Sequence, residues 1–128
     1  MRAQNSFDYA ILRLVPRVER EEFVNAGVVL FSLQKKFLEA RVHLEPERLR
    51  VLWPELDYEM VRDHLEAFPK ICAGSPDAGP IAQLPQRQRF HWLVSPRSTM
   101  IQVSPVHSGL SESPAEALES LFQKLVLR

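Results

Sequence analysis

Two apolar runs and one stretch of alternating apolar and polar positions predict three β-strands in the first third of the chain. Residues 7–15 are apolar on both faces for most of their length, which is typical of a strand that lies inside a sheet or under a helix. Residues 21–31 (EEFVNAGVVLF) form a second apolar run. Residues 37–43 alternate in the manner of a half-exposed strand, with Leu38 and Ala40 on the apolar side.

The first two strands are separated by only a few residues after Pro16, which predicts an antiparallel hairpin. If the hairpin turns in the middle of this connection, Arg13 lies roughly opposite Phe23 and Ile11 lies roughly opposite Asn25. In this register, Asn25 faces an apolar residue across the strand pair.

Asn25 and Gly27 interrupt the second apolar run. A buried asparagine must have its amide hydrogen-bonded, and a glycine weakens a strand unless the backbone geometry requires it. We interpret the pair as a β-bulge, in which Asn25 bonds neighbouring backbone and Gly27 adopts an unusual dihedral angle. The alternative is that Asn25 is presented to a ligand beside such a bulge.

Helices are predicted from their start signals. One begins at residues 45–47 (EPE) and stops before Pro54, and a second is capped by Asp57. The second helix ends near Phe68 or is kinked at Pro69. In the terminal helix, Ser113 and Glu116 have a structural role as a capping box, and its apolar face consists of Leu118, Leu121, Phe122, Leu125 and Val126.

The segment between these helices predicts a loop and a second hairpin. Residues 74–86 are rich in helix and strand breakers and are expected to form a flexible loop. Residues 89–94 and 99–104 are expected to be strands joined by a turn. Such a hairpin brings Arg87 and Arg89 toward the segment before the terminal helix, and it leaves Arg97 about 30 Å from His107.

The predicted order is three strands, two helices, two strands and a helix. This order is typical of the α+β class, with a mostly antiparallel sheet of about five strands and two to three helices packed on it. The 128 residues are expected to form a single domain, 1–128, that buries a proper core.

The amino-acid composition limits which classes of function we expect for this chain. Sixteen basic and sixteen acidic side chains cancel, so no global field favours nucleic acid, anionic membranes or acidic substrates. The single cysteine, Cys72, excludes an intramolecular disulfide framework and is typical of a reducing compartment. The N-terminus lacks the apolar core of a signal peptide, and no run approaches the roughly 20 apolar residues of a membrane span. We therefore expect a cytoplasmic protein without a membrane segment.

His107 and Gly109 mark a second candidate site, because they precede the capped helix, whose N-terminus offers free N–H groups to an anion. With Arg87 and Arg89 close by, this end of the sheet would bind phosphate or carboxylate, and His107 would act as an acid or base. The alternative, which we favour, is that Ser111 and Ser113 satisfy the helix terminus, His107 packs against the loop and the arginines are solvated. These arginines also leave nucleic-acid binding open, although it is not favoured.

Other residues offer little chemistry. Glu22 cannot form an acid/base pair with Glu21, because neighbours on a strand point to opposite faces. No metal-binding spacing, cofactor motif or serine-nucleophile elbow occurs, so neither a metal nor a cofactor is expected. The remaining histidines are scattered: His43, His64 and His91.

Four segments stand out together: FDYAILRLVP at 7–16, EFVNAGVVL at 22–30, SPRS at 95–98, and HSGL followed by LFQKLV at 121–126. In this order they resemble the bacterial domain-of-unknown-function family 3037. The resemblance implies no assigned activity, and it implies a small bacterial protein that accompanies HipA-like kinases, which suggests such a kinase as a protein partner. The positions that match the family pattern are Arg13, Glu22, Asn25, Gly27, Arg97, His107 and Gly109.

Two hypotheses about function result. The favoured one is a non-catalytic protein-interaction or accessory module that holds a partner at an exposed sheet edge or at the 74–86 loop. The second is a small enzyme or a domain that binds an anion, phosphate or nucleic acid, with Glu22, Asn25, His107 and an arginine in one pocket. Side chains more than about 10 Å apart would exclude the second hypothesis in this form, because catalytic hydrogen bonds span about 3 Å.

Overall fold

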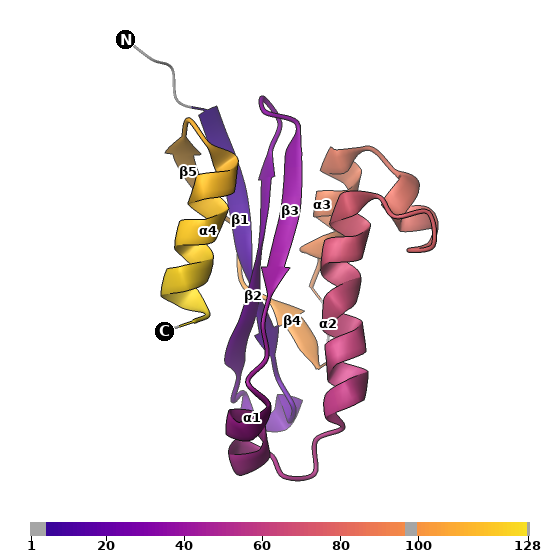
Figure 1. Cartoon of the computed structure of the whole chain (residues 1–128), viewed down its shortest axis with the longest axis vertical. Helices are drawn as coiled ribbons and strands as arrows, with labels where there is room; N and C mark the ends of the chain where they lie inside the picture. The colour runs from indigo at the N-terminus through magenta and orange to yellow at the C-terminus, as the bar shows by residue number, and fades with distance from the viewer. Residues whose placement is uncertain (1–4, 97–99, 128) are drawn as a thin grey trace.

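The computed structural model in Figure 1 describes residues 5–96 and 100–127. Within them, five strands form one antiparallel sheet, and four α-helices pack on it. The predicted α+β fold is confirmed, with four helices where two to three were predicted.

The three strands predicted at the start of the chain are confirmed. They are β1 (Asn5–Leu14), β2 (Val24–Ser32) and β3 (Phe37–Val42), and each pairs antiparallel with the next. A short 3-10 helix, Val18–Arg20, connects β1 to β2. On β3, Leu38 and Ala40 are buried and Glu39 and Arg41 are exposed, as the alternation predicted.

The register of the first hairpin differs from the prediction. Arg13 lies opposite Asn25 rather than Phe23, and Ile11 lies opposite Val28 rather than Asn25. The reason is that the connection is longer than assumed, because β2 begins only at Val24 after the 3-10 helix.

A β-bulge occurs at Asn25–Gly27, as interpreted from the sequence. Leu12 lies opposite Gly27 and Arg13 opposite Asn25, so Ala26 is the extra residue on β2. Neighbouring residues of β1 point to opposite faces, and Asn25 and Gly27 therefore also do so. The bulge thus decides which face of the sheet Asn25 occupies.

The predicted hairpin of residues 89–94 and 99–104 does not form, although its second strand is present as β4 (Ile101–Val103). Residues Gln86–Leu93 form a helix, α3, in which Phe90 and Leu93 are buried at helical spacing. Phe90 stacks on Phe31 of β2, with 5.3 Å between ring centroids. The apparent alternation at 89–94 therefore belonged to a helix whose buried side is fixed by tertiary contacts. Arg97 lies outside the described residues.

The last two strands both pair with β1, on the edge opposite β2. β4 (Ile101–Val103) pairs with Leu12–Leu14, and β5 (His107–Ser111), which the sequence did not predict, pairs with Asn5–Tyr9. Between them, Ser104 donates its N–H to the Ile11 carbonyl (2.9 Å), and its hydroxyl accepts the Ile11 N–H (2.8 Å). Ser104 therefore keeps the edge of β1 hydrogen-bonded where the chain passes from one strand to the other.

The three helices predicted from their start signals are confirmed as α1 (Pro46–Leu52), α2 (Tyr58–Ala73) and α4 (Pro114–Leu125). The Asp57 carboxylate caps α2 by accepting the Met60 N–H (3.2 Å). α2 continues through Pro69 rather than ending near Phe68, and Gly74 at φ 70° ends it.

The segment at 74–86 contains local structure. It includes a 3-10 helix, Pro80–Gln83, in which Ala82 is buried. Gln83 Nε2 donates to the Ser75 carbonyl (3.1 Å). The flexibility expected for this segment stays a prediction.

The sheet lies between two helical layers, with α4 on one face and α2 and α3 on the other (Figure 1). We call the apolar cluster under α2 and α3 the large core, and its centre includes Leu12, Val29, Leu65 and Leu93. We call the cluster under α4 the small core, and its buried members are Phe7, Val28, Leu30 and Leu118.

Candidate functional site

His107 and Asn25 lie at different places on the sheet. His107 is opposite Tyr9 and Asn25 is opposite Arg13. Tyr9 and Arg13 are four positions apart on β1, which is about 13 Å at about 3.3 Å per residue. The two residues also flank β1 on opposite edges, so the structure does not bring them into one pocket.

Asn25 faces α4. Its Nδ2 donates to the Leu125 carbonyl (3.0 Å), one of the carbonyls that a helix leaves unpaired at its C-terminal end. The interpretation that Asn25 bonds backbone is therefore correct, although the backbone belongs to the terminal helix rather than to neighbouring strands.

Gly27 is required for close packing rather than for an unusual dihedral angle. Among the described residues, positive φ values occur at Glu21, Lys36, Gly74 and Gly79, and Gly27 is not one of them. A Cβ on Gly27 would lie 2.7 Å from the Arg41 carbonyl oxygen and 2.9 Å from Val42 Cγ1. The predicted special dihedral is wrong, and the absence of a side chain allows β3 to approach β2.

Arg13 shares the face of Asn25. Its guanidinium lies over the Phe23 ring, 4.4 Å from the centroid, which is a cation–π arrangement. Phe23 is 46% exposed, so this contact lies at the surface.

His107 and Gly109 of β5 make structural contacts. The His107 ring packs on Tyr9, with 5.4 Å between centroids. A Cβ on Gly109 would lie 2.6 Å from Phe7 Cζ, so glycine makes room for a ring of the small core. At the following helix, Ser113 Oγ accepts the Glu116 N–H (3.3 Å) and the Ser113 N–H donates to the Ser111 hydroxyl (3.0 Å). Serines thus satisfy this terminus, as the favoured alternative held.

The arginines predicted to gather beside His107 belong to α3 instead. Arg89 donates to the carbonyls of Ile71 (3.1 Å), Cys72 (2.8 Å) and Leu84 (2.8 Å), and therefore fastens the end of α2 to α3. Arg87 is exposed on the same helix, so the expectation that the arginines are solvated agrees with the structure for Arg87 and is wrong for Arg89. The anion site proposed from the predicted hairpin loses its geometric basis, because that hairpin does not form.

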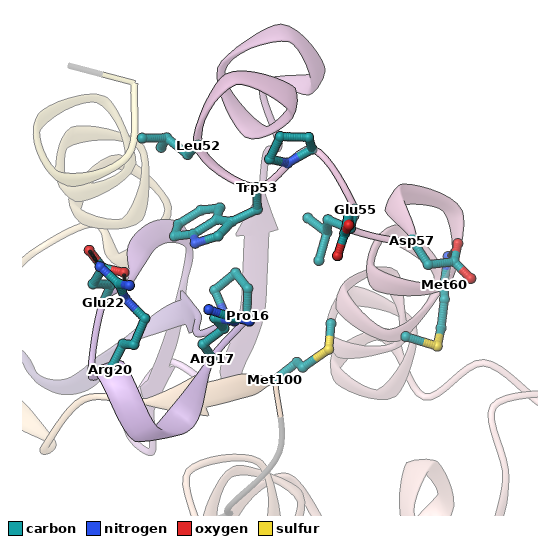
Figure 2. A pocket seen from close by; sticks show the side chains of 12 residues that line it. Pro16, Arg17, Arg20, Glu22, Leu52, Trp53, Glu55, Asp57, Met60 and Met100 are labelled. Atoms are coloured by element: carbon teal, nitrogen blue, oxygen red, sulfur yellow. Dashed lines mark hydrogen bonds and ion pairs between the residues drawn. The ribbon is translucent and has the colours of Figure 1, made fainter.

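A cleft of about 730 Å³ is the site that the sequence did not reveal. It lies between the β1–β2 connection and the α1–α2 connection (Figure 2). Its lining consists of Pro16, Arg17, Arg20, Glu22, Leu52, Trp53, Pro54, Glu55, Leu56, Asp57, Met60 and Met100.

The cleft combines apolar and charged surfaces. Trp53 is half-buried, whereas Leu52 and Met60 are 48% and 41% exposed. Figure 2 shows Arg17 and Arg20 on the side of the β1–β2 connection and Glu55 and Asp57 on the side of the α1–α2 connection. The rim at the β1–β2 connection therefore carries two arginines and Glu22, the opposite rim carries two acids, and apolar side chains lie between them.

Glu22 belongs to this cleft. The Arg20 guanidinium donates to both of its carboxylate oxygens, at 2.6 and 3.4 Å, and this hydrogen bonding raises the pKa of Arg20. Both side chains are more than half exposed, and an ion pair of this kind contributes little to stability. The pair orients two charged groups at the rim.

The ionisable groups of the described lining are carboxylates and guanidinium groups. Among the described lining residues, Glu22, Glu55 and Asp57 carry carboxylates that can act as general acids or bases, and no serine, threonine, cysteine or histidine is present among them. Cys72 lies in the large core, where burial raises the pKa of its thiol to about 12 and keeps it unreactive. Over the described ranges, no group of three or more His, Cys, Asp or Glu side chains is placed to hold a metal ion.

One signal for the cleft was present in the sequence. Residues 52–54 (LWP) place two large apolar side chains directly before a proline, where α1 ends and the connection to α2 begins. Trp53 packs partly against the large core. Its second role, as a wall of the cleft, depends on residues from the distant β1–β2 connection.

The described helices include none with the length and apolar character needed to cross a membrane. Comparison with curated proteins found no match, and comparison with solved structures found none either. The family model described as "Protein of unknown function (DUF3037)" matches residues 9–126, nearly the whole chain. The chain therefore belongs to the DUF3037 family.

Proposed function

We propose that this protein is a non-catalytic protein-interaction module, and that the cleft lined by Trp53 and Met60 is its binding site. The observation that carries the proposal is the composition of the cleft. Protein interfaces are enriched in aromatic residues, methionine and arginine. Among its described lining residues the cleft contains one tryptophan, two methionines and two arginines.

Exposure of the apolar side chains supports the same proposal. Leu52 and Met60 leave 48% and 41% of their surface in contact with water. Apolar surface of this kind, rimmed by charged groups, is typical of interaction sites. The charged rims would set the orientation of a partner and the rate at which it associates. A HipA-like kinase, which the family resemblance suggests, is the partner to test first.

The test is affinity capture from the native organism with the whole chain as bait. Met60→Glu places a charge in the cleft at an exposed position, so the fold is expected to tolerate it. The matched control is Leu110→Glu, which changes a 65% exposed residue of β5, an element that contributes nothing to the cleft. We expect the wild type and the control to recover the same stoichiometric partner and Met60→Glu to lose it, with affinity falling at least about tenfold.

Two results would contradict the proposal. One is the recovery of the same partner in equal amount by Met60→Glu and by the wild type. The other is the failure of the wild-type bait to recover any stoichiometric partner.

A further inference from the structure

β3 forms one edge of the sheet. Among the described strands it pairs only with β2, and Figure 1 shows it at the front of the sheet with no element drawn before it. An edge strand presents unpaired N–H and C=O groups, which are a template for another strand. This edge is separate from the cleft, whose lining includes no residue of β3.

The pairing with β2 shows which backbone groups of β3 are directed outward. The His43 N–H donates to the Ala26 carbonyl (2.8 Å), so these two opposed residues form a hydrogen-bonded pair. Such pairs alternate along an antiparallel ladder. Glu39 and Arg41 therefore direct their backbone groups toward β2, and Leu38, Ala40 and Val42 direct theirs toward the open edge.

The side chains of β3 carry a self-complementary charge pattern. Glu39 and Arg41 are exposed, and because they are two positions apart they lie on the same face. A second β3 that pairs antiparallel about Ala40 places Glu39 of each copy opposite Arg41 of the other. Pairing about Glu39 instead opposes two glutamates, and pairing about Arg41 opposes two arginines, which is destabilising.

We propose that β3 binds β3 of a second copy of this chain, in the antiparallel register centred on Ala40. The outward backbone groups of Leu38, Ala40 and Val42 then form the hydrogen bonds, and two Glu39–Arg41 pairs fix the register. Such a two-fold arrangement uses the same surface on both copies. Arg41 already contacts Glu119 and the Phe122 ring of α4, and its five donors suffice for both carboxylates. One short strand pair makes a small interface, so the dimer is weak and reversible.

Sedimentation velocity over a concentration series tests the proposal with three variants. Glu39→Lys and Arg41→Glu each oppose like charges in the dimer, and we expect each to weaken self-association at least about tenfold. An equal mixture of the two variants restores both opposite-charge pairs and is expected to restore dimers. Glu47→Lys makes the same charge change on α1 and serves as the control, which is expected to dimerise like the wild type.

Hydrogen exchange of the wild type gives a second readout that needs no substitution. We expect the amides of Leu38, Ala40 and Val42 to gain protection as the concentration rises, while those of Glu39 and Arg41 are protected throughout. The proposal is overturned if the wild type stays monomeric at every attainable concentration. It is also overturned if dimers form but neither charge reversal weakens them, or if protection appears on another element.

Discussion

The sheet face under α2 and α3 and the face under α4 are covered by different kinds of contact. The large core draws buried residues from β1, β2, β3 and β4 and from α1, α2 and α3. Its contacts are apolar and come from many elements, so removing one of them leaves the others in place. Such a core supplies most of the free energy that holds a domain together.

The α4 face has few buried apolar residues and several directional contacts. Leu118 and Phe122 are the only apolar side chains of α4 besides Pro114 that are buried within the part described. Around them, Asn25 binds the Leu125 carbonyl, Arg41 binds Glu119, and the Arg41 guanidinium lies 4.9 Å from the Phe122 centroid. A hydrogen bond donated by Gln123 and the charge of Arg41 lower the pKa of the exposed Glu119 carboxyl. The comparison indicates that α4 is the layer that detaches first.

The largest expected effect contrasts one leucine from each face. Leu65→Ala removes a side chain that is 2% exposed in the large core, and we expect it to lower the free energy of unfolding by about 2–5 kcal/mol. Leu121→Ala on α4 removes a side chain that is only half-buried, so its cost should fall below about 2 kcal/mol. Urea denaturation of both variants measures the two values. Equal costs would show that α4 is docked as firmly as α2.

The next effect concerns the β-bulge, after which the side chains of β2 point to the opposite faces of the sheet. In Gly27→Val, the new side chain overlaps the Arg41 carbonyl and Val42, and because one of these is backbone, β3 has to move. We expect a loss of about 1–3 kcal/mol, the usual range for overpacking. Ala26→Gly is the matched control, which removes only a methyl group and should cost about 1 kcal/mol. A Gly27→Val variant as stable as the wild type in urea would contradict the close approach of the two strands.

Local signals in the sequence were sufficient for the parts of the fold that local contacts determine. Apolar runs located β1 and β2, alternation located β3, and caps located α2 and α4, because each of these signals depends on neighbours in the chain. The helix α3 was mistaken for a strand because its position depends on Arg89, which binds carbonyls of Ile71 and Cys72 at the end of another helix. The strand β5 was missed because its sequence, HSGLS, has little strand propensity, and pairing with β1 alone makes it a strand.

In the candidate site too, the sequence indicated what depends on neighbouring residues and not what depends on distant ones. Asn25 was recognised as unusual because its environment in the sequence is apolar, and the bulge followed from Gly27 beside it. Its partner, Leu125, lies 100 residues away, so no local pattern indicated it. The cleft was missed for the same reason, because its rims come from two connections whose proximity depends on the complete fold.

The smallest expected effect tests whether the polar contact of Asn25 stabilises only α4 and leaves α2 unaffected. Asn25→Ala removes the hydrogen bond to the Leu125 carbonyl, and we expect a cost of about 1 kcal/mol, the typical net value of one such bond. Because the bond joins β2 only to the last turn of α4, hydrogen exchange should accelerate at the amides of that turn, whereas the amides of Leu65 and its neighbours in α2 keep their protection. Equal acceleration in both helices would mean that the two faces of the sheet open together. It would contradict the view that α4 is held by polar contacts separately from the large core.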